Sequence, residues 1–265
     1  MINRPDPILE IDHLTGGYPD YTVFQEISFK VMTGEVFVIM GPSGCGKTTL
    51  LKTMTGLIEP LAGEVRYQGK KVEGQAALDA YRRSFGMVFQ QGALLNSISV
   101  MENVALPLRE HTDFPEWMIR RVVEMKLAQV GLLDALHRMP MELSGGMRKR
   151  AGIARALALE PKLLYFDEPT GGLDPVTADG IDNLILGLTQ SLPVTVVVVT
   201  HELASIFKIA DRVMMLRDGA IAVLSPRDEV KNAKDEGVQR FIQRKAPSEE
   251  GAADAFLFEV GGGGE

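Results

Sequence analysis

Residues 41–48 combine glycines, a lysine and a threonine at a spacing suited to phosphate chemistry. They read GPSGCGKT, which satisfies the phosphate-loop pattern G-x-x-x-x-G-K-[ST]. The glycines let successive backbone N–H groups turn toward phosphate oxygens, and a helix that follows adds the partial positive charge of its N-terminus. The pattern predicts that Lys47 reaches the β- and γ-phosphates of a nucleotide and that Thr48 holds Mg²⁺. The nucleotide-binding residues expected in this segment are Gly41, Pro42, Ser43, Gly44, Cys45, Gly46, Lys47, Thr48 and Thr49.

Two adjacent carboxylates, Asp167 and Glu168, supply the residue types for hydrolysis. They follow the apolar run 163–166, which is typical of a strand buried on both faces, and open parallel sheets bind ligands at the carboxyl ends of such strands. We expect Asp167 to lie near a Mg²⁺ ion and to contact the groups that bind the ion directly. Glu168, on the other side of the strand end, can polarise a water for in-line attack. The alternative is an ordinary surface turn before Pro169.

A second anion-binding pattern lies at residues 143–147, which read LSGGM. Ser144 is a suitable N-cap for a helix, and its hydroxyl, the N–H groups of Gly145 and Gly146 and the helix dipole together favour an anion. Since the phosphate loop already takes the phosphates of one nucleotide, this pattern indicates a site for the nucleotide of a neighbouring chain. Taken alone, the same pattern is an ordinary helix cap, and the basic run 148–150 is usually a solvated face.

The elements that must position these residues follow an α/β order. The run 36–40 is short and continuously apolar, as expected of a strand buried on both faces, and it leads into the phosphate loop and a helix over 48–56. Residues 91–160 are mostly helical in pattern, with apolar residues recurring every three or four positions. The other expected elements are antiparallel strands within 8–35 and further strands over 63–70, 85–90, 162–167 and 194–200.

Composition limits the class of protein. The chain has 265 residues, of which 45% are hydrophobic, so there is enough apolar material for a sizeable core and disorder of the whole chain is excluded. With 28 basic and 35 acidic residues the net charge is −7, which argues against a nucleic-acid partner bound through a general positive field. The single cysteine, Cys45, cannot form an intrachain disulfide, and no run approaches the roughly 18 apolar residues of a membrane span. We therefore expect a chain of a reducing cytosol that does not cross a membrane alone.

The motifs, taken in order, resemble the nucleotide-binding domain of ABC transporters over about residues 8–225. The residues that carry the resemblance are 41–48, Gln90, 143–147, Asp167, Glu168, 171–174 and His201. It implies a RecA-like P-loop ABC fold with an antiparallel β subdomain and an inserted α-helical subdomain. The implied divisions are a domain over 1–245, with an ATP-binding core at 1–90 and 161–225 and a helical subdomain at 91–160, and a tail over 246–265. The tail is rich in Gly, Ala and acidic residues, so we expect it to be flexible or to dock on a partner through 256–258.

The resemblance also implies roles for residues outside the phosphate loop. A residue at the position of Tyr18 would stack on the adenine of ATP, with Tyr21 as a competing candidate. Gln90, which is followed by Gln91, would contact Mg²⁺ and sense a permease, and His201 would be catalytic as a switch that hydrogen-bonds the γ-phosphate. The residues implied to act across a homodimer that sandwiches two ATP molecules are Ser144, Gly145, Gly146 and Asp174.

Finer detail is similar to the ATPases of the Mla type. Residues 89–95 and 103–112, with LSGGM where the wider family has LSGGQ, carry this likeness, whereas GGLDP replaces the wider family's SGLDP. It implies phospholipid transport, with the chain peripheral at the cytoplasmic face of a bacterial inner membrane. The implied partners are an integral-membrane permease (MlaE-like), an MCE-domain protein (MlaD-like) and a STAS-domain protein (MlaB-like), and no nucleic acid. The alternatives are a transporter for another substrate, a non-transport ABC ATPase and a small-molecule kinase.

Overall fold

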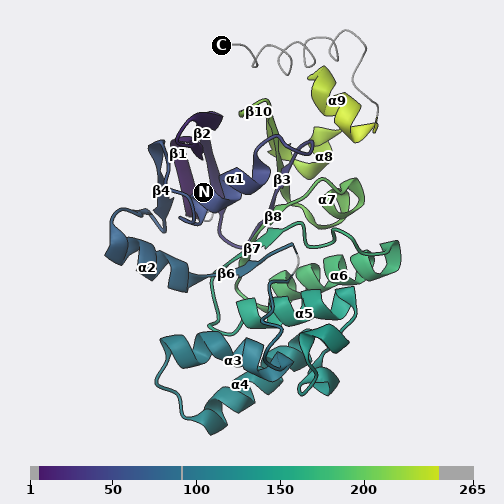
Figure 1. The fold of residues 1–265 in the computed structure, drawn as a ribbon. Coiled ribbons are helices and arrows are strands. Elements are labelled where there is room, and N and C mark those ends of the chain that lie inside the picture. The colour runs from purple at the N-terminus through teal and green to yellow at the C-terminus, as the bar shows by residue number, and fades with distance from the viewer. Residues whose placement is uncertain (1–5, 91, 245–265) are drawn as a thin grey trace, which may run out of the picture.

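The computed structural model describes residues 6–90 and 92–244, which form two β-sheets flanked by helices (Figure 1). The larger sheet has the order β10-β9-β3-β8-β7-β6, in which β10 runs antiparallel to β9 and the other neighbours are parallel. Its strands are β3 (Val36–Met40), β6 (Phe85–Val88), β7 (Leu163–Asp167), β8 (Thr195–Val199), β9 (Arg212–Arg217) and β10 (Ala220–Pro226). Gln91 and the predicted tail 246–265, with its triplet 256–258, lie outside the described residues.

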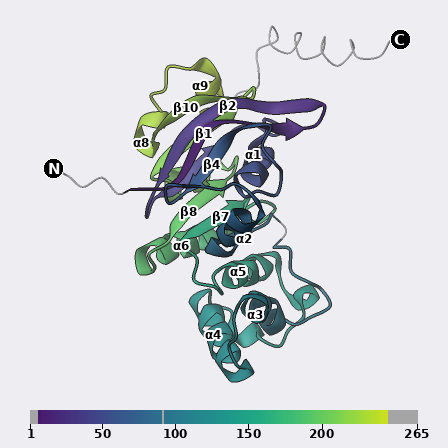
Figure 2. The same ribbon diagram turned by 90° about the vertical axis from the view of Figure 1, so that its left-hand side faces the viewer.

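A second sheet, with the order β2-β1-β4-β5, is antiparallel and lies beside α1 (Figure 2). Along β2, buried Ile27, Phe29 and Val31 alternate with exposed residues, as one half-buried face requires. The strands are β1 (Pro7–Tyr18), β2 (Tyr21–Met32), β4 (Ala62–Tyr67) and β5 (Lys70–Lys71). This is the antiparallel pattern that the alternating runs predict.

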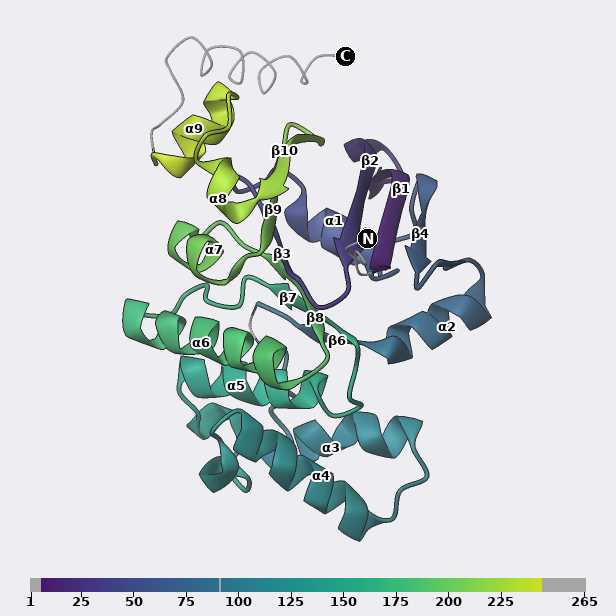
Figure 3. The same cartoon turned by 180° about the vertical axis from the view of Figure 1, so that it is seen from behind.

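The larger sheet is buried on both faces and separates two hydrophobic clusters. Along β3, Val36, Val38 and Met40 belong to one cluster and Phe37 and Ile39 to the other, because successive side chains point to opposite faces. The first cluster also contains residues of α3 to α7, and the second contains residues of α1, α2 and the antiparallel sheet. Figure 3 shows α5 lying between α6 and the pair α3 and α4, in agreement with their packing contacts.

The helices start where the sequence supplies caps. Ser99 accepts a hydrogen bond from the backbone of Glu102 and Ser144 from that of Met147, which satisfies N–H groups of the first turns of α3 and α5. The helices are α1 (Lys47–Met54), α2 (Gln75–Ser84), α3 (Val100–His111), α4 (Glu116–Gln129), α5 (Gly145–Ala156), α6 (Pro175–Ser191), α7 (Leu203–Ile209), α8 (Arg227–Val230) and α9 (Glu236–Ile242).

Three details differ from the sequence-based expectation. Helix α2 is not predicted, because no capping side chain marks its start and Tyr81 is its only buried residue. The strand predicted over 63–70 is two strands, β4 and β5, with a turn between them. The strand predicted over 85–90 ends at Val88, so Gln90 lies in the following loop and does not end the strand. The α/β class is as predicted, and β3, β7 and β8 lie where the sequence predicts strands.

Candidate nucleotide-binding site

Four of the segments predicted to carry chemistry meet at one edge of the larger sheet: they contain the phosphate loop, Gln90, Glu168 and His201. Strands β3, β8, β7 and β6 are consecutive and parallel, so their carboxyl ends lie side by side, where such sheets bind ligands. A cavity of about 880 Å³ opens there. Its lining residues are Tyr21, Thr22, Val23, Pro42, Ser43, Gly44, Cys45, Gly46, Lys47, Thr48, Thr49, Gln90, Glu168, His201, Asp218 and Gly219. The phosphate loop, Gln90, Glu168 and His201 are therefore brought together as predicted.

The phosphate loop takes a backbone path that only glycine follows without strain. Gly46, the N-cap of α1, has φ = 99°, and a Cβ there would lie 2.5 Å from Val23 Cγ1. A Cβ on Gly41 would lie 2.2 Å from the carbonyl oxygen of Leu216. The glycines thus let the loop pack closely against β2 and β9, and the residues that start α1 line the cavity.

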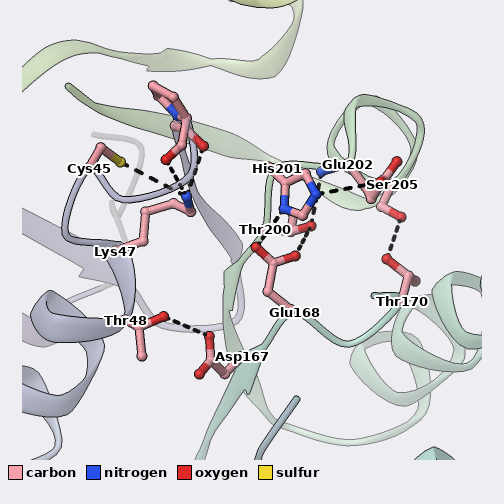
Figure 4. Close-up of polar contacts among 12 residues, drawn as sticks. Cys45, Lys47, Thr48, Asp167, Glu168, Thr170, Thr200, His201, Glu202 and Ser205 are labelled. Atoms are coloured by element: carbon pink, nitrogen blue, oxygen red, sulfur yellow. Dashed lines mark hydrogen bonds and ion pairs between the residues drawn. The ribbon is translucent and has the colours of Figure 1, made fainter. Parts of the chain in front are cut away.

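Lys47 lies inside the loop, with its ammonium held by the loop's own backbone. Its Nζ donates to the carbonyl oxygens of Gly41 and Pro42, each at 2.8 Å (Figure 4). The Sγ atom of Cys45 lies 3.9 Å from the same nitrogen. Because an ammonium bonds a charged phosphate oxygen more strongly than a neutral carbonyl, these contacts are ones that phosphate can replace.

Glu168 projects into the cavity from a strained backbone. Its φ is 47°, in the left-handed region that residues with a Cβ seldom adopt, and its N–H donates to Val199 O at 2.8 Å. The carboxylate accepts a hydrogen bond from Thr200 Oγ1 at 3.2 Å, and its other oxygen lies 2.8 Å from His201 Nδ1 (Figure 4). With one oxygen on a histidine and the group only 8% exposed, this carboxylate has a fixed orientation at the edge of the cavity, and a carboxylate held in this way can act as a general base.

Asp167 lies behind this site, against the phosphate loop. Thr48 Oγ1 is 3.5 Å from Asp167 Oδ1, so both oxygens face the same space (Figure 4). Burial raises the pKa of Asp167 above its usual range and repulsion from Glu168 adds to this, whereas the hydrogen bond from Thr48 and the positive charges of Lys52 and Lys149 oppose it. Hydroxyl and carboxylate oxygens are the ligands that Mg²⁺ prefers, and Mg²⁺ needs few of them because phosphates and water complete its shell. Accordingly, no cage of three or more acidic, His or Cys side chains occurs within 6–90 and 92–244.

The raised pKa of Asp167 predicts that Asp167→Asn makes the nucleotide-free protein more stable at neutral pH. A carboxyl whose folded pKa exceeds its unfolded pKa destabilises the fold while it is ionised, and this is relieved as the pH falls through the folded pKa. We expect Asn to raise the free energy of unfolding by about 1 kcal/mol. Thermal unfolding near pH 7 and near pH 4 measures this. The gain over the parent should shrink at the lower pH, and an equal gain at both would contradict the assignment.

Ser144, Gly145, Gly146 and Asp174 do not line this cavity. Ser144 caps α5 with its hydroxyl accepting from Met147 N at 3.3 Å, and its side chain is exposed. Asp174 caps α6, and the hydrogen bonds from Thr177 hold the pKa of this exposed carboxyl below its usual range. A separate hollow of about 510 Å³, in which Gln90, Gly145 and Lys149 take part, lies beside them. The second anion pattern is therefore formed, but away from the phosphate loop of the same chain.

The two tyrosines proposed for base stacking occupy opposite sides of one hairpin turn. Tyr18 ends β1 and pairs with Tyr21, which starts β2, and the side chains are 50% and 69% exposed. Tyr21 lines the cavity, whereas Tyr18 is not among the lining residues. Thr22, Val23, Asp218 and Gly219 also line it without having been predicted. They come from β2 and from the turn between β9 and β10, and no motif marks them.

The basic run 148–150 is not the solvated face expected from its charge. Arg148 donates to Leu143 O at 2.6 Å and Arg150 to Val130 O at 2.8 Å. Lys149 is buried and donates to the carbonyl oxygens of Gln90 and Glu168. Successive residues on a helix point about 100° apart, so three basic residues in a row cannot all face solvent on a helix packed on several sides. That geometry indicates that at least one of the three residues turns toward the protein, but it does not say which one.

Comparison with known proteins defines the class. A sequence model of the ABC transporter family matches residues 24–171, more than half of the chain. The chain therefore belongs to the ABC transporter family and is an ATP-hydrolysing subunit of it. It is similar to the intermembrane phospholipid transport system ATP-binding protein MlaF of Haemophilus influenzae, with 40% identity over 238 residues that cover 89% of this chain and 90% of the relative.

Solved structures agree with the fold. CbiO1 from Clostridium perfringens, part of the ABC transporter complex cbiONQ, superposes with a TM-score of 0.80 and 28% identity over 96% of this chain and 100% of that one. The dimeric ATP-binding cassette MJ0796, in a post-hydrolysis state with ADP and Pi, gives a TM-score of 0.76 and 31% identity over 83% of this chain and 98% of that one. They confirm the ABC cassette fold predicted from the motifs. Within the residues that the structure describes, no helix has the length and apolar content of a membrane span.

Proposed function

We propose that this chain drives phospholipid transport between the two membranes of a bacterium, bound peripherally at the cytoplasmic face of the inner membrane. The observation that carries the ATPase part is the convergence of the phosphate loop, Glu168 and His201 on one cavity. The likeness to MlaF supports the lipid part. The proposed division is an ATPase domain over 1–245, with a helical subdomain at 91–160 inserted in a core at 1–90 and 161–225.

In the proposed mechanism ATP binds with its phosphates in the loop 41–48. Lys47 exchanges its two carbonyl acceptors for phosphate oxygens, and the N-terminus of α1 adds its dipole. Glu168 takes the proton of the attacking water on its carboxylate, while His201, 2.8 Å away, fixes the orientation of that carboxylate and reaches the γ-phosphate. Mg²⁺, when bound, neutralises charge on the phosphates, and Thr48, Gln90 and Asp167 would hold it.

A homodimer completes the proposed site. Ser144, Gly145 and Gly146 form a helix start suited to an anion, and they do not line the nucleotide cavity of their own chain. In a two-fold dimer each chain offers this helix start to the γ-phosphate held by the other, and Asp174 links the two sites. ATP then stabilises the closed dimer, and hydrolysis removes the charge-assisted contacts that hold it. We propose Tyr18 for base stacking, with Tyr21 as the alternative that lines the cavity.

The proposed partners follow from the same likeness. They are an integral-membrane permease (MlaE-like), an MCE-domain protein (MlaD-like) and a small STAS-domain protein (MlaB-like), with no nucleic acid. The permease supplies the spanning helices and the contact with the transported molecule, since an ATPase of this family acts on the substrate only through it. A transporter for another substrate is the alternative, because the substrate does not touch this chain.

Purification of the tagged full chain from its native membranes in mild detergent tests this proposal. We expect mass spectrometry to find a multi-span permease, an MCE-domain protein and phospholipid with the chain. In the control, in which the tag is expressed without the chain, we expect none of them. If a permease is found with a different binding protein, the proposal that the chain belongs to a transporter stands, but phospholipid is excluded as the transported substrate. Recovery of the chain with no membrane subunit would contradict the transport function.

A further inference from the structure

Lys149 is a buried lysine at the point where three parts of the site meet. It lies on α5 and is 5% exposed. Its Nζ donates to the carbonyl oxygen of Glu168 at 2.9 Å and to that of Gln90. One ammonium therefore joins the helix that starts at Ser144, the loop that follows β6 and the peptide that follows β7.

The acceptors of this ammonium are backbone carbonyls and not a carboxylate. Burial lowers the pKa of Lys149, and only the fields of Glu168 and Asp167 oppose this. An ammonium that is buried in this way costs free energy unless its hydrogen bonds are well placed, and an apolar side chain of similar length would fill the same space without that cost. Packing alone therefore does not account for a lysine at this position.

The carbonyl that Lys149 holds belongs to the strained peptide of Glu168. A residue with a Cβ seldom adopts φ = 47°, and it keeps this conformation only where its surroundings fix it. Here the N–H of Glu168 is fixed by Val199 O at 2.8 Å, and its C=O accepts from Lys149 and from Gly171 N at 3.2 Å. The backbone from which the carboxylate projects is thus held on both sides, and Lys149 supplies the charged contact.

The loop at Gln90 is attached to the same helix by a second cation. Arg155 of α5 donates to Ala93 O at 2.8 Å and to Gly92 O at 3.2 Å. The backbones also approach closely, since a Cβ on Gly152 would lie 3.2 Å from Gly92 O. The carbonyls of this loop are therefore bound to α5, and Lys149 is the contact that continues from them to Glu168.

We propose that Lys149 is a positioning residue for ATP hydrolysis: its ammonium fixes the peptide of Glu168 and joins it to the carbonyl of Gln90, so that a displacement of this loop or of α5 moves the catalytic carboxylate. The inference rests on the proposed role of Glu168 as the group that accepts the proton. It assigns to one side chain the link between the helix start at Ser144 and the reacting atoms.

The first test compares Lys149→Met with Lys149→Arg in the full chain, alone and with its co-purified membrane subunits. We expect Lys149→Met to lower kcat about tenfold or more while KM for ATP changes less than about twofold, because Lys149 does not line the nucleotide cavity. Lys149→Arg, which keeps donors and charge, should recover part of the rate. Lys126→Met is the matched control, since Lys126 is a lysine 2% exposed in α4 that pairs with Glu160, away from the site. It should leave kcat unchanged.

The second test repeats Lys149→Met in a Glu168→Gln background, with residual hydrolysis followed in single-turnover reactions. If Lys149 acts through Glu168, the added substitution changes the residual rate less than about twofold. An equal loss of rate in both backgrounds, or a loss of ATP affinity, would mean a general structural role and overturn the proposal. If Glu168→Gln alone hydrolyses ATP at the wild-type rate, Glu168 is not the group that accepts the proton. Normal turnover of Lys149→Met beside an inactive Glu168→Gln would overturn only the positioning role.

Discussion

Glu168→Gln is expected to slow steady-state ATP hydrolysis by about 10²- to 10⁴-fold while ATP still binds. Glutamine has the shape of glutamate and keeps an acceptor for Thr200 Oγ1, which now contacts the carboxylate at 3.2 Å. It is neutral, however, and cannot take the proton of the attacking water. The nucleotide should therefore remain bound and intact, and the dimer that it closes should accumulate.

Phosphate release, binding of a fluorescent ATP analogue and mass by light scattering measure the three parts of this result. Glu202→Gln is the matched control, because Glu202 is also a carboxylate beside His201, with 3.7 Å between its Oε1 and Nε2 of the ring, but it does not line the cavity. It should hydrolyse ATP at the parent rate. Turnover of Glu168→Gln at the parent rate, assayed together with its permease, would refute the role of Glu168.

Lys47→Ala and Ser144→Asp are expected to abolish ATP occlusion in the dimer for different reasons. Loss of the Lys47 ammonium removes charge-assisted bonds to phosphate, so the affinity of the single chain for ATP should fall about 10- to 100-fold. Aspartate at Ser144 remains a good N-cap, so α5 should keep its start, but it places a negative charge where the partner's γ-phosphate would lie.

The two variants therefore separate binding from closure. Ser144→Asp should bind ATP as a single chain with the parent affinity and yet fail to form a dimer that retains it, when both are measured in the Glu168→Gln background. Ser144→Asn, a neutral cap of the same size, is the control and should close more readily than Ser144→Asp. If Ser144→Asp forms the ATP-retaining dimer at the same ATP concentration as the parent protein, this helix start does not contact the γ-phosphate.

Most of the site could be predicted because its residues follow strands that are apolar on both faces. The runs 36–40 and 163–166 are apolar on both faces, so their assignment as strands is clear, and a parallel sheet places their carboxyl ends together. The phosphate loop needs glycine for a reason that is local to its backbone, since Gly46 has φ = 99°. Local chemistry of this kind is visible in one sequence.

Contacts between distant segments could not be predicted in the same way. Lys149 lies 59 residues from Gln90 and 19 from Glu168, and its donors act on carbonyl groups that every residue possesses. Helix α2 has no capping side chain at its start, so no local signal marks where it begins. The positions of Tyr18 and Tyr21 about the cavity depend on how the antiparallel sheet packs over the phosphate loop, which neither tyrosine encodes.

Mixing two inactive variants tests most directly whether each ATP site is shared between two chains. One chain carries Lys47→Ala and the other Ser144→Asp, both with Glu168→Gln, and different tags allow the mixed dimer to be isolated. A shared site predicts one retained ATP per mixed dimer, formed by Lys47 of one chain and Ser144 of the other, and none in either variant alone. No retention in the mixed dimer would mean that Lys47 and Ser144 act on the same ATP within one chain. Full retention by Ser144→Asp alone would mean that Ser144 takes no part. Either result would contradict the account.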